Sequence, residues 1–210
     1  MKRIFVALLL AAAVPVAGAS AVQKKAAAGK EKKMSTPRDY ANTLVTLQTD
    51  MGDITIKFDY DKAPKHVENF VDLAAKGFYD GTMFHRVIPG FMIQGGDPNT
   101  KKAEDPMHPY GTGGNVVNGK EQTLKAEFND ISHKRGIVSM ARSNDPNSAS
   151  SQFFIVVKDS TFLDGQYSAF GEVVSGMDVA DKIVNAPRGP NDRPNTPIRI
   201  KKAVVTQPKG

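Results

Sequence analysis

The sequence predicts a mainly β protein, built as a closed antiparallel barrel with helices as lids. Three observations lead to this fold class. Apolar and polar residues alternate at both ends of the folded part, short apolar runs broken by glycine, proline and asparagine fill its middle, and only two segments have helical spacing. With 210 residues, 40% of them hydrophobic, the chain suits one domain with a buried core.

The first expected elements are a hairpin and a helix. Thr43–Thr49 and Ile54–Phe58 are rich in β-forming residues, and the turn Asp50–Asp53 lies between them. Pro64 can occupy the first turn of a helix, apolar residues follow at helical spacing, and Gly77 ends it.

The rest of the chain contains short strand candidates separated by long loops. These candidates are Met83–Ile88, Phe91–Gln94, Gly136–Ala141, Phe153–Val157 and Ala169–Val174. A second helix is expected over Met177–Val184, and a closing strand over Ile198–Thr206. The loops Asp97–Leu124 and Arg142–Ser151 are long for a compact domain, and such loops are usually functional.

The N-terminus has the layout of a secretory signal peptide, predicted over residues 1–21. Lys2 and Arg3 give a positive start, Ile4–Val14 is an uninterrupted apolar run, and small residues then allow cleavage after Ala19 or Ala21. The alternative is an uncleaved anchor, but the run is shorter than the ~20 apolar residues that span a bilayer. After cleavage no membrane-inserted segment would remain, and the lack of cysteine excludes lipoprotein attachment.

Residues 22–38 are expected to form a flexible linker, and residues 39–210 the folded domain. The linker is rich in Lys, Ala and Gly, and its alternative role is a basic tether to an anionic surface such as lipid headgroups. The net charge of +6 belongs to the leader and the linker, because 20 basic and 21 acidic residues nearly cancel from Asp39 onward. The domain therefore has no excess of positive charge with which to bind nucleic acid. A monomer is the simplest expectation for this single, nearly neutral domain.

The available residue types also exclude several kinds of site. The chain has no cysteine, so disulfides, thiolate catalysis and thiolate metal sites are ruled out. Its four histidines are scattered without ligand spacing, and Gly111–Gly114 lacks the Lys-Ser/Thr pair of a phosphate-binding loop. We therefore expect no metal and no cofactor.

The most informative stretch is Phe84–Asp97, FHRVIPGFMIQGGD. Arg86 and Gln94 interrupt apolar runs where a strand face would be buried, and a buried arginine is costly without partners. Three glycines in the stretch permit unusual backbone conformations or close approach. From the residues alone, two interpretations stay open, which are a functional site and a strand pair with one structural salt bridge.

This stretch resembles the signature of the cyclophilins, and five later segments match that family in the same order. They are GTGG at 111–114, GIVSMA at 136–141, SQFFI at 151–155, FLDG at 162–165 and FG at 170–171. The resemblance covers roughly residues 41–205. It implies an eight-stranded antiparallel barrel capped by two α-helices, with an active-site groove on the outer face of the barrel.

The resemblance implies that Arg86 is the main catalytic residue, with Gln94 and Phe91 beside it. It also implies a set of substrate-binding residues, namely His85, Met92, Gly113, Arg142, Gln152, Phe154, Phe162, Leu163 and Tyr167. Phe91, Met92, Phe154 and Leu163 would form the proline pocket. Without the resemblance, these four residues would be assigned to the ordinary core.

Three positions depart from many eukaryotic cyclophilins. Phe162 stands where they have Trp, Tyr167 where they have His, and Arg142 where they have Asn. The Trp position is tied to cyclosporin binding in the family, so tight inhibition is not expected. Arg142 would add positive charge to the groove and favour acidic residues beside proline. With the leader, these substitutions point to a bacterial member in the periplasm.

The expected function is peptidyl-prolyl cis/trans isomerisation that assists the folding of exported proteins, with proline-containing polypeptides as partners. One alternative is a non-catalytic holdase that binds proline-containing segments through the same groove. Arg86 favours the enzyme, because binding alone does not need a guanidinium fork. A third possibility is a tethered adaptor that acts through residues 22–38.

Overall fold

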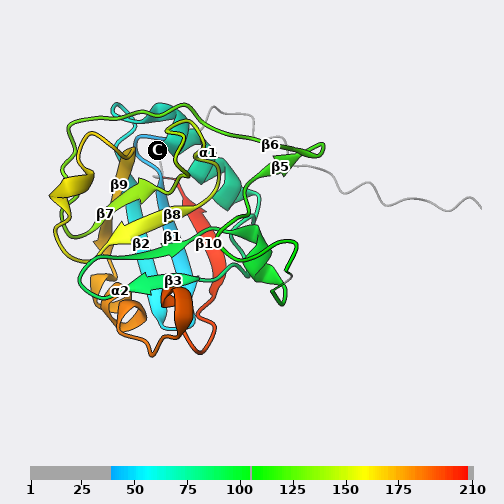
Figure 1. Cartoon of the computed structure of the whole chain (residues 1–210). Coiled ribbons are helices and arrows are strands. Elements are labelled where there is room, and N and C mark those ends of the chain that lie inside the picture. Colours follow the sequence, from blue (N-terminus) through cyan, green and yellow to red (C-terminus); the bar gives the residue numbers. More distant parts are fainter. Residues whose placement is uncertain (1–38, 105, 208–210) are drawn as a thin grey trace, which may run out of the picture. The chain divides into compact units, whose positions relative to one another are not determined.

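The computed structural model describes residues 39–104 and 106–207 (Figure 1). The predicted signal peptide (1–21) and linker (22–38) lie outside the described residues. Within the described part, none of the helices has the length and apolar character needed to cross a bilayer.

Ten strands, two α-helices and three short 3₁₀ helices make up this part of the chain. In order they are β1 (Leu44–Thr49), β2 (Gly52–Phe58), α1 (Pro64–Ala75), β3 (Arg86–Ile88), β4 (Met92–Gly95), η1 (Pro98–Lys101), β5 (Val116–Val117), β6 (Lys120–Glu121), β7 (Ile137–Met140), β8 (Phe153–Val156), η2 (Thr161–Leu163), β9 (Ala169–Ser175), α2 (Met177–Val184), η3 (Pro190–Asp192) and β10 (Ile200–Thr206).

Eight of these strands form one antiparallel sheet in the order β10-β1-β2-β9-β7-β8-β4-β3. The sheet is strongly curled (Figure 1). Its two ends approach each other just outside the named strands, where Met83 and Arg199 form an isolated antiparallel bridge. Phe84 N donates to Ile198 O at 3.0 Å on one side of that bridge. The mainly β class, the eight antiparallel strands and the two α-helices are therefore confirmed.

The β1–β2 hairpin is the expected one, and α2 packs closely against it. Strand alternation buries Val45 and Leu47 on β1 and Ile54 and Ile56 on β2. The two strands pair from Leu44–Lys57 to Thr49–Gly52. Gly52 has a φ of +126°, and a Cβ there would lie 2.8 Å from Val179 Cγ2 of α2, so only glycine allows this approach.

The two α-helices lie at opposite ends of the curled sheet (Figure 1). α1 begins with Pro64 at its first position and ends before Gly77, whose φ of +70° suits glycine. It buries a stripe that includes Val67, Phe70 and Val71. The bounds of α2 coincide with the predicted Met177–Val184.

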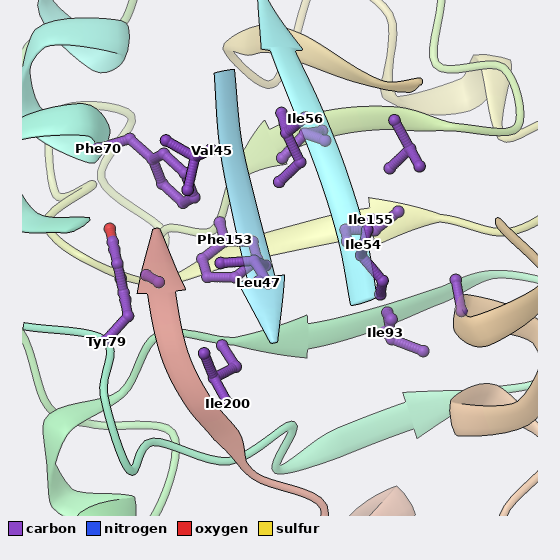
Figure 2. Close-up of a cluster of buried hydrophobic side chains, with 14 of the residues drawn as sticks. Val45, Leu47, Ile54, Ile56, Phe70, Tyr79, Ile93, Phe153, Ile155 and Ile200 are labelled. Carbon is purple, nitrogen blue, oxygen red and sulfur yellow. The ribbon is translucent and has the colours of Figure 1, made fainter. Parts of the chain in front are cut away.

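The main core lies inside the curled sheet and under α1 (Figure 2). Phe70 of α1 is its aromatic centre, with ring centroids 5.1 Å from Phe153 and 4.9 Å from Tyr79. The Tyr79 hydroxyl donates to Ser151 O at 3.2 Å, and complete burial raises the pKa of this phenol well above its ordinary value. The Tyr79 hydroxyl is thus a buried polar group with a satisfied hydrogen bond.

Two features differ from the sequence prediction. The β3 ladder begins at Arg86 rather than at Met83, because Met83 pairs across to Arg199 instead. The loop 97–124 contains the small hairpin β5–β6, where no strand was predicted. Its turn residues Asn118 and Gly119 both have positive φ, as a two-residue hairpin turn requires. All four strand residues are exposed, so no apolar alternation marks them.

Candidate active site

The site is built on the outer face of the same strands that enclose the core. Side chains along a strand alternate between its two faces. On β8, Phe153 and Ile155 point into the main core, as Figure 2 shows, while Phe154 and Val156 belong to a second cluster. On β4, Ile93 points into the core and Met92 into the second cluster.

The second cluster forms the floor of an open pocket. Met92, Phe154, Val156 and Leu163 are its buried members, and Phe91 and Tyr167 pack on it while half-buried. The pocket has a volume of about 400 Å³. Its lining comprises Arg86, Phe91, Met92, Gln94, Ala141, Arg142, Phe154, Phe162, Leu163 and Tyr167. The four predicted proline-pocket residues are thus together, and they lie apart from the main core.

Arg86 stands at the polar side of this pocket. The expectation of a buried strand face is wrong for Arg86, which is exposed on β3, the edge strand of the sheet. Arg86 lies opposite Gln94 in the β3–β4 register, and its Nη1 donates to Gln94 Oε1 at 3.4 Å. No carboxylate of the described residues pairs with it, so the structural salt bridge is not found there.

A directional chain of hydrogen bonds extends from Arg86 across the site. Gln94 Nε2 donates to Gln152 Oε1 at 3.0 Å, and Gln152 Nε2 donates to the carbonyls of Gly111 and Gly113 at 3.0 and 2.8 Å. The two carbonyls can only accept, so they fix the orientation of the Gln152 amide. That orientation fixes Gln94, which then presents its oxygen to the guanidinium.

Three side chains form the outer rim. Phe162 of η2 is 65% exposed, and its ring centroid lies 5.5 Å from that of Phe91. Tyr167 packs edge-on against Phe154 at 5.8 Å, and the Arg142 guanidinium lies 4.5 Å above the Tyr167 ring. Arg142 also donates to the carbonyls of Gln166 and Ser143, so its charge is held at the mouth of the pocket.

A second cavity of about 380 Å³ continues the groove past Gln94. It contains the predicted residues Gly113, Arg142 and Gln152. Ala141 lines both cavities and was not assigned a role from the sequence. It belongs to the GIVSMA segment, and a small residue there leaves space between Gln94 and Arg142.

His85, like Gly113 and Gln152, is a predicted site residue that does not line the proline pocket. It borders a third cavity of about 450 Å³, which it shares with Arg86 and Gln94. The side chain is buried, and neither ring nitrogen has a hydrogen-bond partner in the described part of the chain. Burial lowers the pKa of His85, and the nearby Asp97 carboxylate opposes this only in part. Gln94 lines all three cavities and is the centre of the site.

Among residues 39–104 and 106–207, no group of three or more His, Cys, Asp or Glu side chains could hold a metal ion. The groove lining offers the guanidinium groups of Arg86 and Arg142, glutamine side chains and apolar rings, with the hydroxyls of Ser143, Ser148 and Ser150 in its polar part. The guanidinium and amide groups can bind and polarise a peptide amide.

Comparison with known proteins gives a consistent result. The family model described as cyclophilin type peptidyl-prolyl cis-trans isomerase/CLD matches residues 44–205. A probable peptidyl-prolyl cis-trans isomerase of Brucella abortus (strain 2308) is 43% identical over 205 residues, covering 96% of each chain. Peptidyl-prolyl cis-trans isomerase A of Dickeya dadantii (strain 3937) is 43% identical over 173 residues, covering 78% of this chain and 85% of that one.

A solved structure resembles this fold as well. It is the crystal structure of a Cryptosporidium parvum cyclophilin type peptidyl-prolyl cis-trans isomerase in the presence of the dipeptide Ala-Pro. It has 33% identity and a TM-score of 0.69, and the match covers 79% of this chain and 99% of that chain. The sequence signature, the outer-face groove and these matches agree: the chain belongs to the cyclophilin-type peptidyl-prolyl cis-trans isomerase family.

Proposed function

We propose that this chain catalyses cis/trans isomerisation of Xaa-Pro peptide bonds in polypeptides exported across a membrane. The observation that carries the proposal is Arg86, a guanidinium without a carboxylate partner in the described residues, placed at the edge of an apolar pocket. A cation next to an apolar pocket fits a substrate that has an apolar ring and an adjacent amide.

The reaction requires rotation about a partly double C–N bond, with a barrier of ~18–20 kcal/mol. The two isomers of an Xaa-Pro bond differ by only about 0.5–1 kcal/mol, but they exchange over tens to hundreds of seconds. No covalent bond has to break. The protein accelerates exchange if it binds the twisted amide more tightly than either planar form.

Arg86 supplies this differential binding. When the amide twists, its resonance is lost and the proline nitrogen becomes pyramidal, with a basic lone pair. A fixed guanidinium can donate a hydrogen bond to that lone pair, and its charge is permanent. Gln94 Oε1 orients the guanidinium through the chain that ends at the Gly111 and Gly113 carbonyls. This preorganisation means that little rearrangement is needed at the moment of reaction.

The apolar floor holds the proline ring while the preceding carbonyl rotates. Met92, Phe154 and Leu163 are buried and can enclose the ring, and the exposed Phe162 can cover it from the rim. The polar cavity around Gly113 and Gln152 can bind the neighbouring main chain. The related Cryptosporidium structure obtained in the presence of Ala-Pro supports this choice of ligand.

The test is the exchange rate of a short Xaa-Pro peptide with the wild-type protein and with Arg86→Ala. We expect wild-type acceleration by orders of magnitude, and a loss of about 10²–10³-fold in kcat/KM for Arg86→Ala. Arg135→Ala is the matched control, because Arg135 forms a two-pronged salt bridge with Asp181 outside the groove and should leave turnover unchanged. A wild type that binds the peptide without acceleration would replace this proposal by the holdase function.

Export and monomeric action are parts of the same proposal. The positive start, the apolar run Ile4–Val14 and the small residues at 17–21 support transport across the inner membrane to the periplasm. N-terminal sequencing of the protein recovered from its host should show a mature chain that begins at Ser20 or Val22. An intact Met1 would contradict export by cleavage, and a dimer in light scattering would contradict the monomer.

A further inference from the structure

A row of three polar side chains lies directly behind the proline pocket. Asp164 Oδ1 lies 2.9 Å from His133 Nδ1, and His133 Nε2 lies 3.1 Å from Ser139 Oγ. This carboxylate, imidazole and hydroxyl are in the order that serine hydrolases use. The arrangement therefore needs an explanation, because isomerisation requires no nucleophile.

The row cannot act as a hydrolytic site. His133 and Ser139 are both completely buried, and neither lines any of the three cavities around Gln94. Phe154 covers the imidazole on its pocket side, with the two rings nearly parallel at 18° and 6.2 Å between their centroids. A substrate that occupies the pocket meets Phe154, not the serine.

His133 instead supports the pocket from behind. Its ring stacks on Phe154 and meets Tyr167 edge-on at 6.5 Å, while Phe154 and Tyr167 contact each other at 5.8 Å. The imidazole is thus packed against two walls of the pocket. A rigid ring in this place limits the positions that Phe154 can take when proline binds.

His133 also holds η2 at both of its ends. Before η2, Ser160 N donates to His133 O at 2.8 Å. After η2, the Asp164 carboxylate accepts from His133 N at 2.7 Å and from the imidazole. The helix held in this way carries Phe162 and Leu163, which form the rim and part of the floor of the pocket.

The charges of the row fix the orientation of the imidazole. The backbone amide of His133 and then the Ser132 hydroxyl lower the pKa of Asp164, so this carboxylate is ionised at neutral pH. An ionised carboxylate accepts, so Nδ1 carries a proton and donates to it. Nε2 then pairs with the Ser139 hydroxyl at 3.1 Å. Both ring nitrogens are thus satisfied, and a flipped ring would break both contacts.

We propose that His133 is a positioning residue for the isomerisation, fixing Phe154 through its ring and Leu163 through Asp164. This inference rests on the proposed function, since it concerns the placement of proline relative to Arg86. Wall contacts are made in every state of the substrate, and alignment with Arg86 matters only in the twisted state. Loosening the walls should therefore weaken peptide binding slightly and turnover more strongly.

The experiment compares His133→Phe with His66→Phe. His66 is an equally buried histidine whose backbone amide and Nδ1 both contact one carboxylate, that of Glu127, at 3.0 and 2.6 Å. It lines none of the three cavities. Both variants remove a buried imidazole that contacts a carboxylate through Nδ1, and they differ at Nε2, which contacts Ser139 in His133 and has no partner in His66. Turnover is therefore compared below the unfolding transition of each variant. With the folded proteins, His133→Phe should lower kcat/KM about tenfold, and His66→Phe should leave it unchanged.

Asp164→Asn provides a second arm, because this carboxylate is partly exposed and the amide keeps the acceptor oxygen. We expect a loss of about threefold in kcat/KM, and less than additive loss when it is combined with His133→Phe, since both act through one contact. Unchanged turnover in both single variants, or an equal loss in His66→Phe, would overturn the inference.

Peptide affinity separates this inference from the proposed function. The dissociation constant of an Ala-Pro peptide, followed by NMR titration, needs no turnover. If the wild type does not accelerate exchange, the proposed function fails, yet His133→Phe should still bind the peptide about threefold more weakly than His66→Phe does. Equal affinity of the two variants would show that His133 does not shape the pocket.

Discussion

The inner and outer faces of β4 and β8 perform different tasks with neighbouring residues. Phe153 and Ile155 belong to the core inside the sheet, whereas Phe154 and Val156 belong to the cluster under the groove. The inner face meets α1 and other apolar side chains, while the outer face meets polar groups and solvent. Alternate residues of one strand therefore serve different purposes, with inward side chains stabilising the fold and outward ones lining the groove. The face on which a residue lies predicts whether its substitution lowers stability or turnover.

Replacement of two adjacent phenylalanines is the largest test of this comparison. Phe153 is completely buried and contacts the rings of Phe70, Tyr79 and Phe84. Phe153→Ala should lower the free energy of unfolding by about 3–5 kcal/mol, because a cavity remains among fixed rings. Phe154→Ala should cost less stability, since its cluster opens to solvent and can partly collapse, but it removes a wall of the proline pocket.

Urea unfolding of both variants measures the loss of stability, and peptide turnover measures the loss of activity. Below its unfolding transition, Phe153→Ala should keep a kcat/KM close to that of the wild type, and Phe154→Ala should lose more than about tenfold. If both variants lose turnover equally when folded, the two faces of β8 do not have separate roles.

Much of this arrangement was predictable, because strand and helix periodicities are local. The expected α2 has the observed bounds, and the expected Ile54–Phe58 lies within β2. The cyclophilin motifs indicated the groove residues, and the structure brings them around Gln94. Their packing on a face opposite to the core depends on strand pairing, which the apolar runs alone do not determine.

The features that the sequence did not predict depend on contacts between distant residues. Arg86 is exposed on the edge strand β3, and both its exposure and the edge position depend on how the whole sheet is assembled. The row Asp164–His133–Ser139 joins residues 31 and 6 positions apart, and no spacing rule marks it. The β5–β6 hairpin shows only its Asn-Gly turn in the sequence, since its strands bury nothing.

Acid should lower the free energy of unfolding, while the guanidinium groups of the groove keep their charge. Burial lowers the pKa of His66 below its ordinary value of 6.5, and the Glu127 contact offsets this only in part. The reason is visible in its surroundings, because Nε2 is buried without a partner and could not hold a second proton favourably. Between the folded pKa and 6.5, the unfolded chain therefore binds more protons than the folded one.

The free energy of unfolding should consequently fall as pH drops below about 6.5, by up to ~1.4 kcal/mol per pH unit for each such histidine. His85, whose pKa is also lowered by burial, should add to this loss. Urea unfolding between about pH 7.5 and 5.5 measures the slope, and His66→Gln should reduce it. A stability that stays constant or rises on acidification would contradict this prediction.

The smallest expected effect concerns the charge that the outer face carries and the inner face lacks. Arg142 lines two of the three cavities around Gln94, and no carboxylate in the described part of the chain neutralises it. A half-exposed charge of this kind contributes about 0.3–1 kcal/mol, so peptides with Glu beside proline should turn over roughly two- to fivefold faster than those with Lys. High salt should reduce the preference, since the groove is open to ions.

Two replacements separate the charge of Arg142 from its packing. The guanidinium lies on the Tyr167 ring and donates to the Gln166 carbonyl, so any change here also loosens the rim. Arg142→Lys keeps the charge without the planar fork and should retain the preference for Glu, whereas Arg142→Gln should reduce it to what the Arg86 charge alone provides. Equal rates for Glu and Lys peptides with the wild type would mean that Arg142 acts only through its packing. In that case the outer face would select its ligand by shape rather than by charge.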